Sequence, residues 1–280
     1  MELKPTVKAF MMLSPFRTAL FLLFLCSPFL VSAQTVAPDS AIQHMISQTV
    51  VKQQLDETTS DVRKQIKSNP LNLSDKKISQ MVAQFDQAFT ADRLMKQVKT
   101  TFNEQYDPSL ATSTINWLNK PLTNKILDEK KRFYSLQGER ERIVHRYEME
   151  QNPISTDRKN LLQKLTEATS ANKSTTKSQT IIFRSILSAF NKLSSRNLTK
   201  TQIDGIVQNY RQQIQSQIDQ GVIDQASVMF YNVDDKALGD YLSFYQSKAG
   251  RWLSSTTADG IHTALQSAAD RFNKAVAEIK

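Results

Sequence analysis

The sequence predicts an all-α protein, a helical bundle built from two related multi-helix repeats. Three observations predict it. Glycine is scarce, with six in 280 residues. Apolar residues recur at intervals of three and four, which is helical spacing, and no alternating run with hairpin turns stands out. Finally, residues 72–85 and 197–210 align without a gap at an offset of 125. Two helices with the same cap and the same apolar stripe predict a repeated packing unit.

Residues 1–33 have the parts of a secretory signal peptide. A basic flank precedes an apolar run at residues 19–25, and Ala33 completes a small-x-small cleavage site. An uncleaved anchor helix is the alternative, but the apolar segment is shorter than the about 20 residues that span a bilayer. Lipidation of Cys26 is a second alternative, but Leu25 before it is bulky where such sites have a small residue. We expect cleavage near Ala33 and a periplasmic or secreted protein.

Composition restricts the chemistry and the partners. Cys26 is the single cysteine, and it leaves with the signal peptide, so the mature chain has no disulfide, thiol nucleophile or thiolate ligand. The net charge is +9 for the whole chain and +7 without residues 1–33, an excess that favours anionic neighbours such as an envelope surface. We expect a protein partner or self-association in the cell envelope, and no nucleic acid. The stretch from Lys125 to Glu150 mixes both signs, which is typical of a solvated helix face.

The expected organisation has four parts: the signal peptide at 1–33, a first helical repeat at 34–150, a polar linker at 151–174 and a second helical repeat at 175–280. Asn152-Pro153 interrupts the periodic pattern at the start of the linker, and residues 168–177 are polar and low in bulky side chains.

Helix ends can also be predicted. Ser74, Thr90, Asp107, Thr199 and Asp234 are suited to N-cap positions, and Pro108 follows Asp107 at a first turn.

Other boundaries follow from apolar spacing. A long helix is expected from about Leu122 to Glu148, with a bend at Gly138, and Gly221 is expected to end a helix as a C′ residue. The last segment, from Ile261 to Ile279, carries a narrow apolar seam. Such a seam is typical of an internal bundle helix, and a homodimer contact is the alternative.

A second anchor of the duplication is a short aromatic motif. It runs Phe244-Tyr245-Gln246-Ser247-Lys248-Ala249-Gly250, and a degraded version begins at Trp117 and includes Pro121. Ser247 is expected to cap a new helix, Pro121 to open the matching helix, and Gly250 to permit a close approach of backbone. Phe244 and Tyr245 would fill the corner. The alternative is a ligand site that uses Tyr245, Ser247 and Arg251.

This motif resembles the F-Y-x-S-P-x-G-x-K pattern of a bacterial family of exported helical proteins known as domain-of-unknown-function family twenty fifty-nine. The chain would hold two degenerate copies. The second keeps the aromatic pair, Ser247 and Gly250, but has Lys248 in place of proline. The first keeps an aromatic residue and Pro121. The resemblance covers about 50 residues of each half, and it implies a helical fold and an exported location but no activity.

The residues suited to chemistry do not form a recognisable site. His145 has Glu141 and Glu148 within helical reach, a spacing that also occurs on ordinary charged faces. His262 lies near Asp259, and no nucleophile elbow, phosphate loop, zinc-protease or dinucleotide motif is present. We therefore predict no catalytic residue, cofactor or metal site.

We expect a non-enzymatic interaction or scaffold protein of the bacterial envelope. One alternative is a chaperone-like carrier of peptides or lipid tails with an apolar groove, which an exposed band including Phe230, Tyr231, Phe244 or Tyr245 would support. Another is an envelope hydrolase with an unrecognised site.

Overall fold

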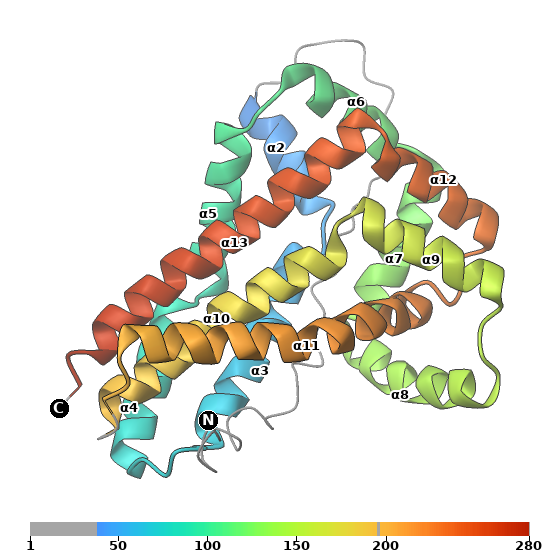
Figure 1. Ribbon diagram of the computed structural model, residues 1–280. Helices are drawn as coiled ribbons and strands as arrows, with labels where there is room; N and C mark the ends of the chain where they lie inside the picture. Colours follow the sequence, from blue (N-terminus) through green and yellow to red (C-terminus); the bar gives the residue numbers. More distant parts are fainter. Residues whose placement is uncertain (1–37, 195–196, 280) are drawn as a thin grey trace.

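The computed structural model describes residues 38–194 and 197–279, and within these ranges the fold is all-α, as predicted (Figure 1). The predicted signal peptide lies outside the described residues. Across the described ranges, no helix combines the length and apolarity needed to cross a membrane. The helices are α2 (Pro38–Ser47), α3 (Val51–Lys67), α4 (Asp75–Ala88), α5 (Ala91–Glu104), α6 (Pro108–Leu118), α7 (Pro121–Phe133), α8 (Leu136–Gln151), α9 (Thr156–Ala168), α10 (Ala171–Leu193), α11 (Lys200–Met229), α12 (Asp235–Gln246) and α13 (Lys248–Val276).

The N-caps predicted at Ser74, Asp107, Thr199 and Asp234 are confirmed, whereas Thr90 precedes α5 but its side chain makes no capping hydrogen bond. Ser74, Asp107, Thr199 and Asp234 precede α4, α6, α11 and α12, and each side chain accepts a hydrogen bond from a backbone N–H of the first turn. Thr199 also forms a capping box, because the side chain of Gln202 binds back to the Thr199 N–H at 2.8 Å. These helix starts are therefore fixed by local chemistry that the sequence displays.

Three predicted boundaries are wrong. The helix expected from Leu122 to Glu148 is two helices, α7 and α8, and Gly138 lies in the first turn of the second. Gly221 does not end a helix, because α11 continues through it to Met229. Residues 151–174 are not an extended polar linker: they contain all of α9 and the start of α10, and α9 buries leucines against the bundle.

Helix boundaries recur along the chain. Shifted by 125 residues, the start of α4 and the end of α5 fall on the two ends of α11. Shifted by 127, the start of α7 falls on the start of α13, and the break between α7 and α8 falls inside it. The packing partners recur too, since α2 contacts α5 and α6 while α9 contacts α11 and α12. At these offsets, the helices are broken between residues 75 and 151 where they are continuous between residues 200 and 276.

The turns before α4 and α11 share the same local geometry. Asn72 and Asn197 both have positive φ, 53° and 44°. In each turn the following leucine, Leu73 or Leu198, has its backbone N–H and carbonyl bound by one asparagine side chain, with distances of 2.7–3.0 Å. Asparagine tolerates this left-handed conformation better than most residues.

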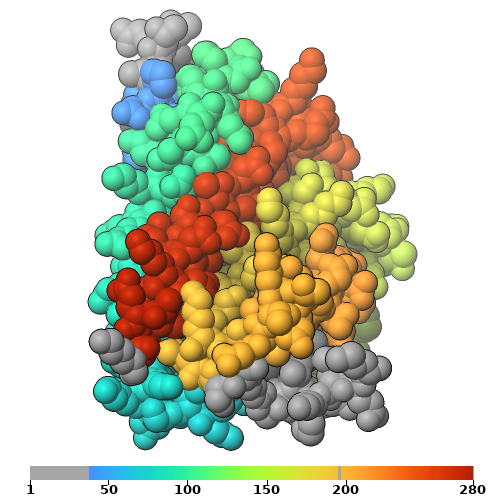
Figure 2. Space-filling model, turned by 60° about the vertical axis from the view of Figure 1, so that its left-hand side comes forward, coloured from blue at the N-terminus to red at the C-terminus, as the bar shows by residue number. Residues whose placement is uncertain are grey.

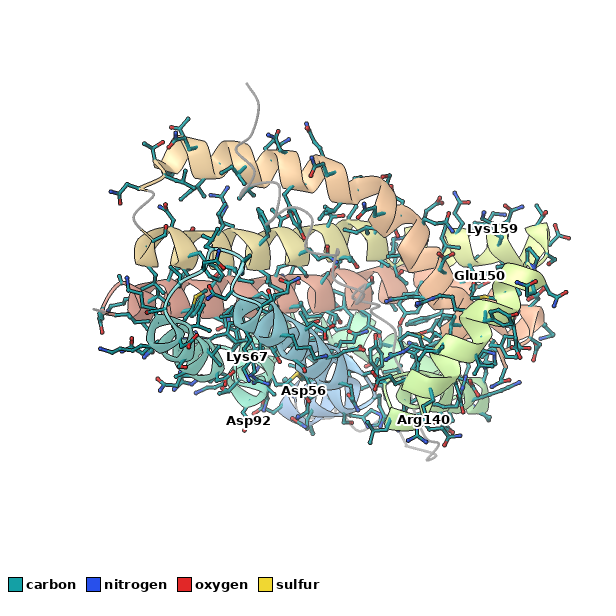
Figure 3. The ribbon with its side chains drawn as sticks, turned by 90° about the horizontal axis from the view of Figure 1, so that it is seen from below. Asp56, Lys67, Asp92, Arg140, Glu150 and Lys159 are labelled. Atoms are coloured by element: carbon teal, nitrogen blue, oxygen red, sulfur yellow. The ribbon has the colours of Figure 1, made fainter. Side chains whose placement is uncertain are left out.

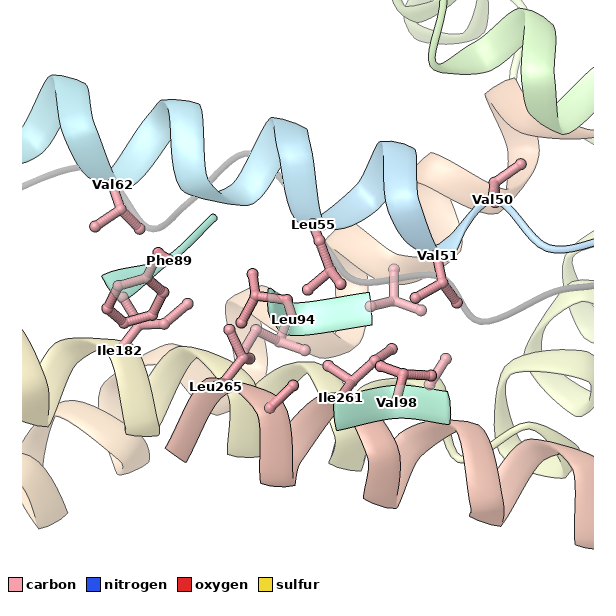
Figure 4. Packing of buried hydrophobic residues seen from close by; sticks show 14 of the residues in the cluster. Val50, Val51, Leu55, Val62, Phe89, Leu94, Val98, Ile182, Ile261 and Leu265 are labelled. Carbon is pink, nitrogen blue, oxygen red and sulfur yellow. The ribbon is translucent and has the colours of Figure 1, made fainter. Parts of the chain in front are cut away.

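Helix α13 lies at the centre of the bundle, packed against α10 on one side and α4, α5 and α6 on the other (Figures 1 and 2). Its apolar seam is buried, with Ile261 and Leu265 beside Leu94 and Val98 of α5 (Figure 4). The interpretation as an internal bundle helix is confirmed. The alternative of a homodimer contact through this seam is wrong, because the chain itself covers it. The core runs continuously through both halves.

Candidate functional site

The aromatic motif forms a tight helix–corner–helix joint, as predicted. Ser247 separates α12 from α13, and its Oγ accepts a hydrogen bond from the Gly250 N–H at 3.1 Å. A Cβ at Gly250 would lie 2.1 Å from the carbonyl oxygen of Phe244, so only glycine fits without a shift. In the matching first-half corner Pro121 opens α7. There Thr123 takes the place of the glycine and donates its hydroxyl to the carbonyl of Leu118 at 2.8 Å.

The two corners meet at their aromatic residues. Trp117 stacks on Phe244 with ring centroids 3.8 Å apart and planes 8° apart, and Tyr245 lies edge-on to both rings. Tyr245 is fully buried. Trp117 and Phe244 are separated by 127 residues, the same offset that relates the starts of α7 and α13. The motif is therefore part of the core.

A second copy of this joint was missed by the sequence analysis. Between α7 and α8, Ser135 Oγ accepts a hydrogen bond from the Gly138 N–H at 3.0 Å. A Cβ at Gly138 would lie 1.9 Å from the carbonyl oxygen of Arg132. The signal that could have found it is Phe133-Tyr134-Ser135-x-x-Gly138, which matches the second-half motif with one residue deleted.

Helix α8, which starts at this joint, has its polarity inverted. Leu136, Ile143 and Tyr147 are exposed by 83%, 69% and 65%, and Val144 by 54%. Of its residues, only Gly138 is buried. The expectation of an ordinary solvated face for this charged stretch holds only in part. Glu139, Arg140, Arg146, Glu148 and Glu150 are exposed, but Glu141, Arg142 and His145 are half-buried on the inner side of the helix, opposite the exposed apolar residues.

The matching positions of α13 show the ordinary arrangement. Residues 127 positions after Leu136, Ile143 and Tyr147 are the exposed Thr263, Asp270 and Lys274. On the side of the helix that faces the protein, charged or polar residues of α8 stand where α13 has apolar residues. The positions of the buried residues Ala268, Ala269 and Phe272 are taken in α8 by Glu141, Arg142 and His145.

An ionic layer lies beneath α8. Arg142 pairs with Glu57 of α3 at 3.2 Å, donates to the carbonyl of Phe133 at 3.0 Å and stacks over that ring at 4.6 Å. Glu141 pairs with Arg132 of α7. These side chains are 19–29% exposed, so their interactions are only partly screened by solvent. Burial raises the pKa of Glu57, and the guanidinium of Arg142 offsets part of this rise.

A cleft of about 560 Å³ separates α3 from α8. Its charged lining residues are Asp56, Glu57, Asp61 and Lys64 of α3 and Glu139, Arg142 and Arg146 of α8. The exposed Leu136 and Ile143 of α8 also border its rim. Three of the four carboxylates that line it are already paired: Asp56 with Lys52, Glu57 with Arg142 and Asp61 with Lys64. The matching helices α10 and α13 are tightly packed instead. There Ile182, Ile186 and Ala189 stand 125 positions after Glu57, Asp61 and Lys64. Charged residues in place of core residues explain why this cleft is open.

The outer row of α8, called the α8 seam below, comprises Leu136, Arg140, Ile143, Tyr147 and Glu150. All five are exposed. Their spacing of four, three, four and three residues is that of a heptad seam. Neither Arg140 nor Glu150, labelled in Figure 3, makes an ion pair with another described residue. The helix thus presents an apolar stripe with a cation towards one end and an anion at the other.

The histidines do not form a metal centre. His145 Nδ1 lies 2.9 Å from Glu148, and the ring stacks on Tyr231 at 4.0 Å, whereas Glu141 pairs with Arg132. In the part of the chain that the structure describes, no group of three histidine or carboxylate side chains could hold a metal ion. His262 is 7% exposed and contacts Ser174 rather than a carboxylate.

The ligand site considered for Tyr245 and Arg251 is not assembled. Tyr245 is in the core, while Arg251 is exposed and lines a separate hollow of about 450 Å³. Of the aromatic residues that could form an exposed carrier surface, Phe230, Phe244 and Tyr245 are buried. Tyr231 alone of this group is exposed, by 48%.

Comparisons with known proteins give no relative. No protein-family model, no curated protein and no solved structure matches this chain.

Proposed function

We propose that this chain is an exported, non-enzymatic interaction protein of the bacterial envelope that associates with a second copy of itself through the α8 seam. The observation that carries the proposal is the inversion of α8. Single exposed apolar residues are common on protein surfaces. Here, however, an exposed stripe at heptad spacing coincides with charged residues on the inner side of the same helix.

Self-complementarity of the α8 seam supports a second copy as the occupant. In an antiparallel pair of α8 helices centred on residue 145, Ile143 of each copy lies opposite Tyr147 of the other. Arg140 then lies opposite Glu150. A twofold interface requires one patch to complement itself, and this seam does so in both polarity and charge. One helix pair buries a small area, so we expect weak association, with a dissociation constant of about 10 μM to about 1 mM.

Charge exchange tests this pairing. Arg140→Glu places two acids opposite each other, and Glu150→Arg places two bases opposite each other. We expect the association constant of each variant alone to fall by about tenfold or more. An equimolar mixture of the two variants should associate again, because both contacts then join a glutamate of one chain to an arginine of the other. Sedimentation velocity over a range of concentrations measures the outcome.

Matched charge reversals elsewhere provide the control. Lys67→Glu and Asp92→Arg change exposed residues far from the α8 seam (Figure 3) and should leave association unchanged. A wild-type chain that stays monomeric up to about 1 mM contradicts the proposal. So does a mixture of Arg140→Glu and Glu150→Arg chains that remains monomeric.

We also propose that the chain is a duplication, with units at about 38–151 and 156–279. The recurring helix boundaries, the shared turns at Asn72 and Asn197 and the recurring helix contacts support it. On this proposal, α8 is the diverged counterpart of the second half of α13. The resemblance to the exported family of unknown function rests on the corner motif and adds an expected location.

A further inference from the structure

We infer that the hollow lined by Arg251 binds a small organic anion, a phosphate or carboxylate group joined to an apolar body. This hollow, called the Trp252 hollow below, has a volume of about 450 Å³ and lies between the first turns of α10 and one side of α13. It is separate from α8, so the inference does not depend on the proposed self-association.

Positive charge is unbalanced in the Trp252 hollow. Lys173 and Lys177 lie one turn apart on α10, and Arg251 faces them from α13. None of the three pairs with a described carboxylate. Arg251 donates only to the carbonyl of Gln246. Asp259 is the one acid in the lining, and it accepts a hydrogen bond from Gln105 at 3.3 Å. Three cations against one carboxylate favour an anionic ligand.

An aromatic surface is placed beside these cations. The Trp252 indole is fixed, because its Nε1–H donates to the carbonyl of Gln105 at 3.0 Å and its ring meets Phe102 edge-on. A held indole offers an apolar face with little entropy left to lose on binding. The Trp252 hollow therefore suits a ligand with an apolar part as well as an anionic group.

Two further polar groups border the Trp252 hollow. Ser170 caps α10 in a left-handed conformation, φ 53°, and its side chain makes no capping hydrogen bond. The amide end of α10 is thus available to add its positive dipole. His262 is 93% buried at the same hollow, since 7% of it is exposed, and its Nδ1 has no hydrogen-bond partner. Burial lowers the pKa of His262. Its Nε2–H donates to the carbonyl of Ser174 at 3.1 Å, so Nδ1 of the neutral ring is a hydrogen-bond acceptor that can receive a hydroxyl or N–H of the ligand but does not bind the anionic group.

Phenyl phosphate is the probe, because it joins a dianion to an aromatic ring. The chain has two tryptophans, and Trp117→Phe leaves Trp252 as the single fluorescent reporter. We expect saturable quenching with an affinity about tenfold above that of phenol or inorganic phosphate. Calorimetric titration of the wild-type chain gives the same comparison if Trp117→Phe does not fold.

Variants locate the binding. Lys177→Gln and Arg251→Gln should each lower the affinity for phenyl phosphate by about tenfold. Lys159 is an exposed lysine of α9 (Figure 3), and the matched control Lys159→Gln should leave this affinity unchanged. Equal weakening by the control overturns the inference, as does binding of inorganic phosphate as tight as that of phenyl phosphate.

Flotation with phosphatidylglycerol vesicles, against phosphatidylcholine vesicles, distinguishes the two sources of such a ligand. Binding of phenyl phosphate in solution supports a free organic anion. Vesicle binding that Arg251→Gln removes, without phenyl phosphate binding, supports a lipid headgroup. If the chain binds neither phenyl phosphate nor phosphatidylglycerol vesicles, the inference is overturned.

Discussion

Replacing Gly250 by alanine tests the packing of the corner between α12 and α13. The new Cβ would lie 2.1 Å from the Phe244 carbonyl oxygen and 2.6 Å from the Cα of Tyr245. Ordinary contacts at this carbon begin near 3.4 Å, so the two helices must separate by about 1 Å. Both obstructing atoms are backbone, which cannot rotate away. Overpacking of this kind costs about 1–3 kcal/mol or more.

Alanine also has the higher helix propensity, by about 1 kcal/mol, which opposes the clash. We expect a net destabilisation of about 2 kcal/mol or more for Gly250→Ala, and more for Gly250→Leu. Gly221→Ala is the matched control. Gly221 lies within α11 and nothing would contact its Cβ, so the same substitution should stabilise by about 0.5–1 kcal/mol.

Differential scanning calorimetry measures both the expected destabilisation by Gly250→Ala and the expected stabilisation by Gly221→Ala. For a chain of this size, 1 kcal/mol corresponds to about 2–4 °C in Tm. We expect Gly250→Ala to melt at least about 4 °C below the wild type and Gly221→Ala to melt slightly above it. If Gly250→Ala melts at or above the wild-type temperature, the close approach at this corner does not exist and the reasoning is refuted.

Two basic side chains, the buried Lys130 and the half-buried Arg158, give further predictions. Lys130 is fully buried against the Tyr241 hydroxyl at 2.6 Å, and burial holds its pKa well below the usual value of 10.5. Between these two pKa values the unfolded chain binds a proton that the folded chain lacks, so stability rises with pH toward about 10. Urea unfolding at several pH values should show this rise in the wild type and lose it in Lys130→Met; an unchanged slope contradicts the assignment. Arg158 donates to two carbonyls of the α11–α12 turn at 2.6 and 2.9 Å. We expect Arg158→Met to cost about 2–4 kcal/mol in urea unfolding, against less than about 0.5 kcal/mol for the exposed control Arg211→Met; equal costs would show that the turn does not depend on this guanidinium.

The parts of the fold that the sequence could predict are those fixed by local chemistry. Ser74, Asp107, Thr199 and Asp234 cap helices because a short polar side chain reaches the first-turn N–H groups in nearly any context. Gly250 could be predicted for a similar reason, since a glycine three residues after a capping serine marks a close backbone approach.

Other boundaries depended on tertiary packing. Helix α9 shows few apolar positions, and only contact with α11 and α12 reveals that Leu162 and Leu165 are core residues. Gly221 resembles a helix end in sequence, but glycine inside an exposed helix costs only about 1 kcal/mol, and the packing of α11 on both sides of it exceeds that cost.

The α8 seam could not be predicted, because periodicity gives the faces of a helix but not which face is buried. The usual assumption places the apolar face inward. In α8 that assumption fails, since Arg142 and Glu141 find partners on α3 and α7 that were not recognisable from spacing along one helix. The charge pattern of the stretch pointed to a solvated face for the same reason.

The break between α7 and α8 explains why this inversion arises in one half. At the matching place α13 continues straight through Ile261 and His262, and its following turns remain in the core. In the first half, the joint at Ser135 and Gly138 redirects the chain. Helix α8 thereby leaves the position where an apolar inner face would be needed, and α3 no longer requires apolar residues opposite it. The cleft, the ionic layer and the α8 seam then follow from one change of direction. If Gly138→Leu straightened or displaced this joint, stability and self-association would be lost together, whereas Ile143→Lys should remove self-association alone.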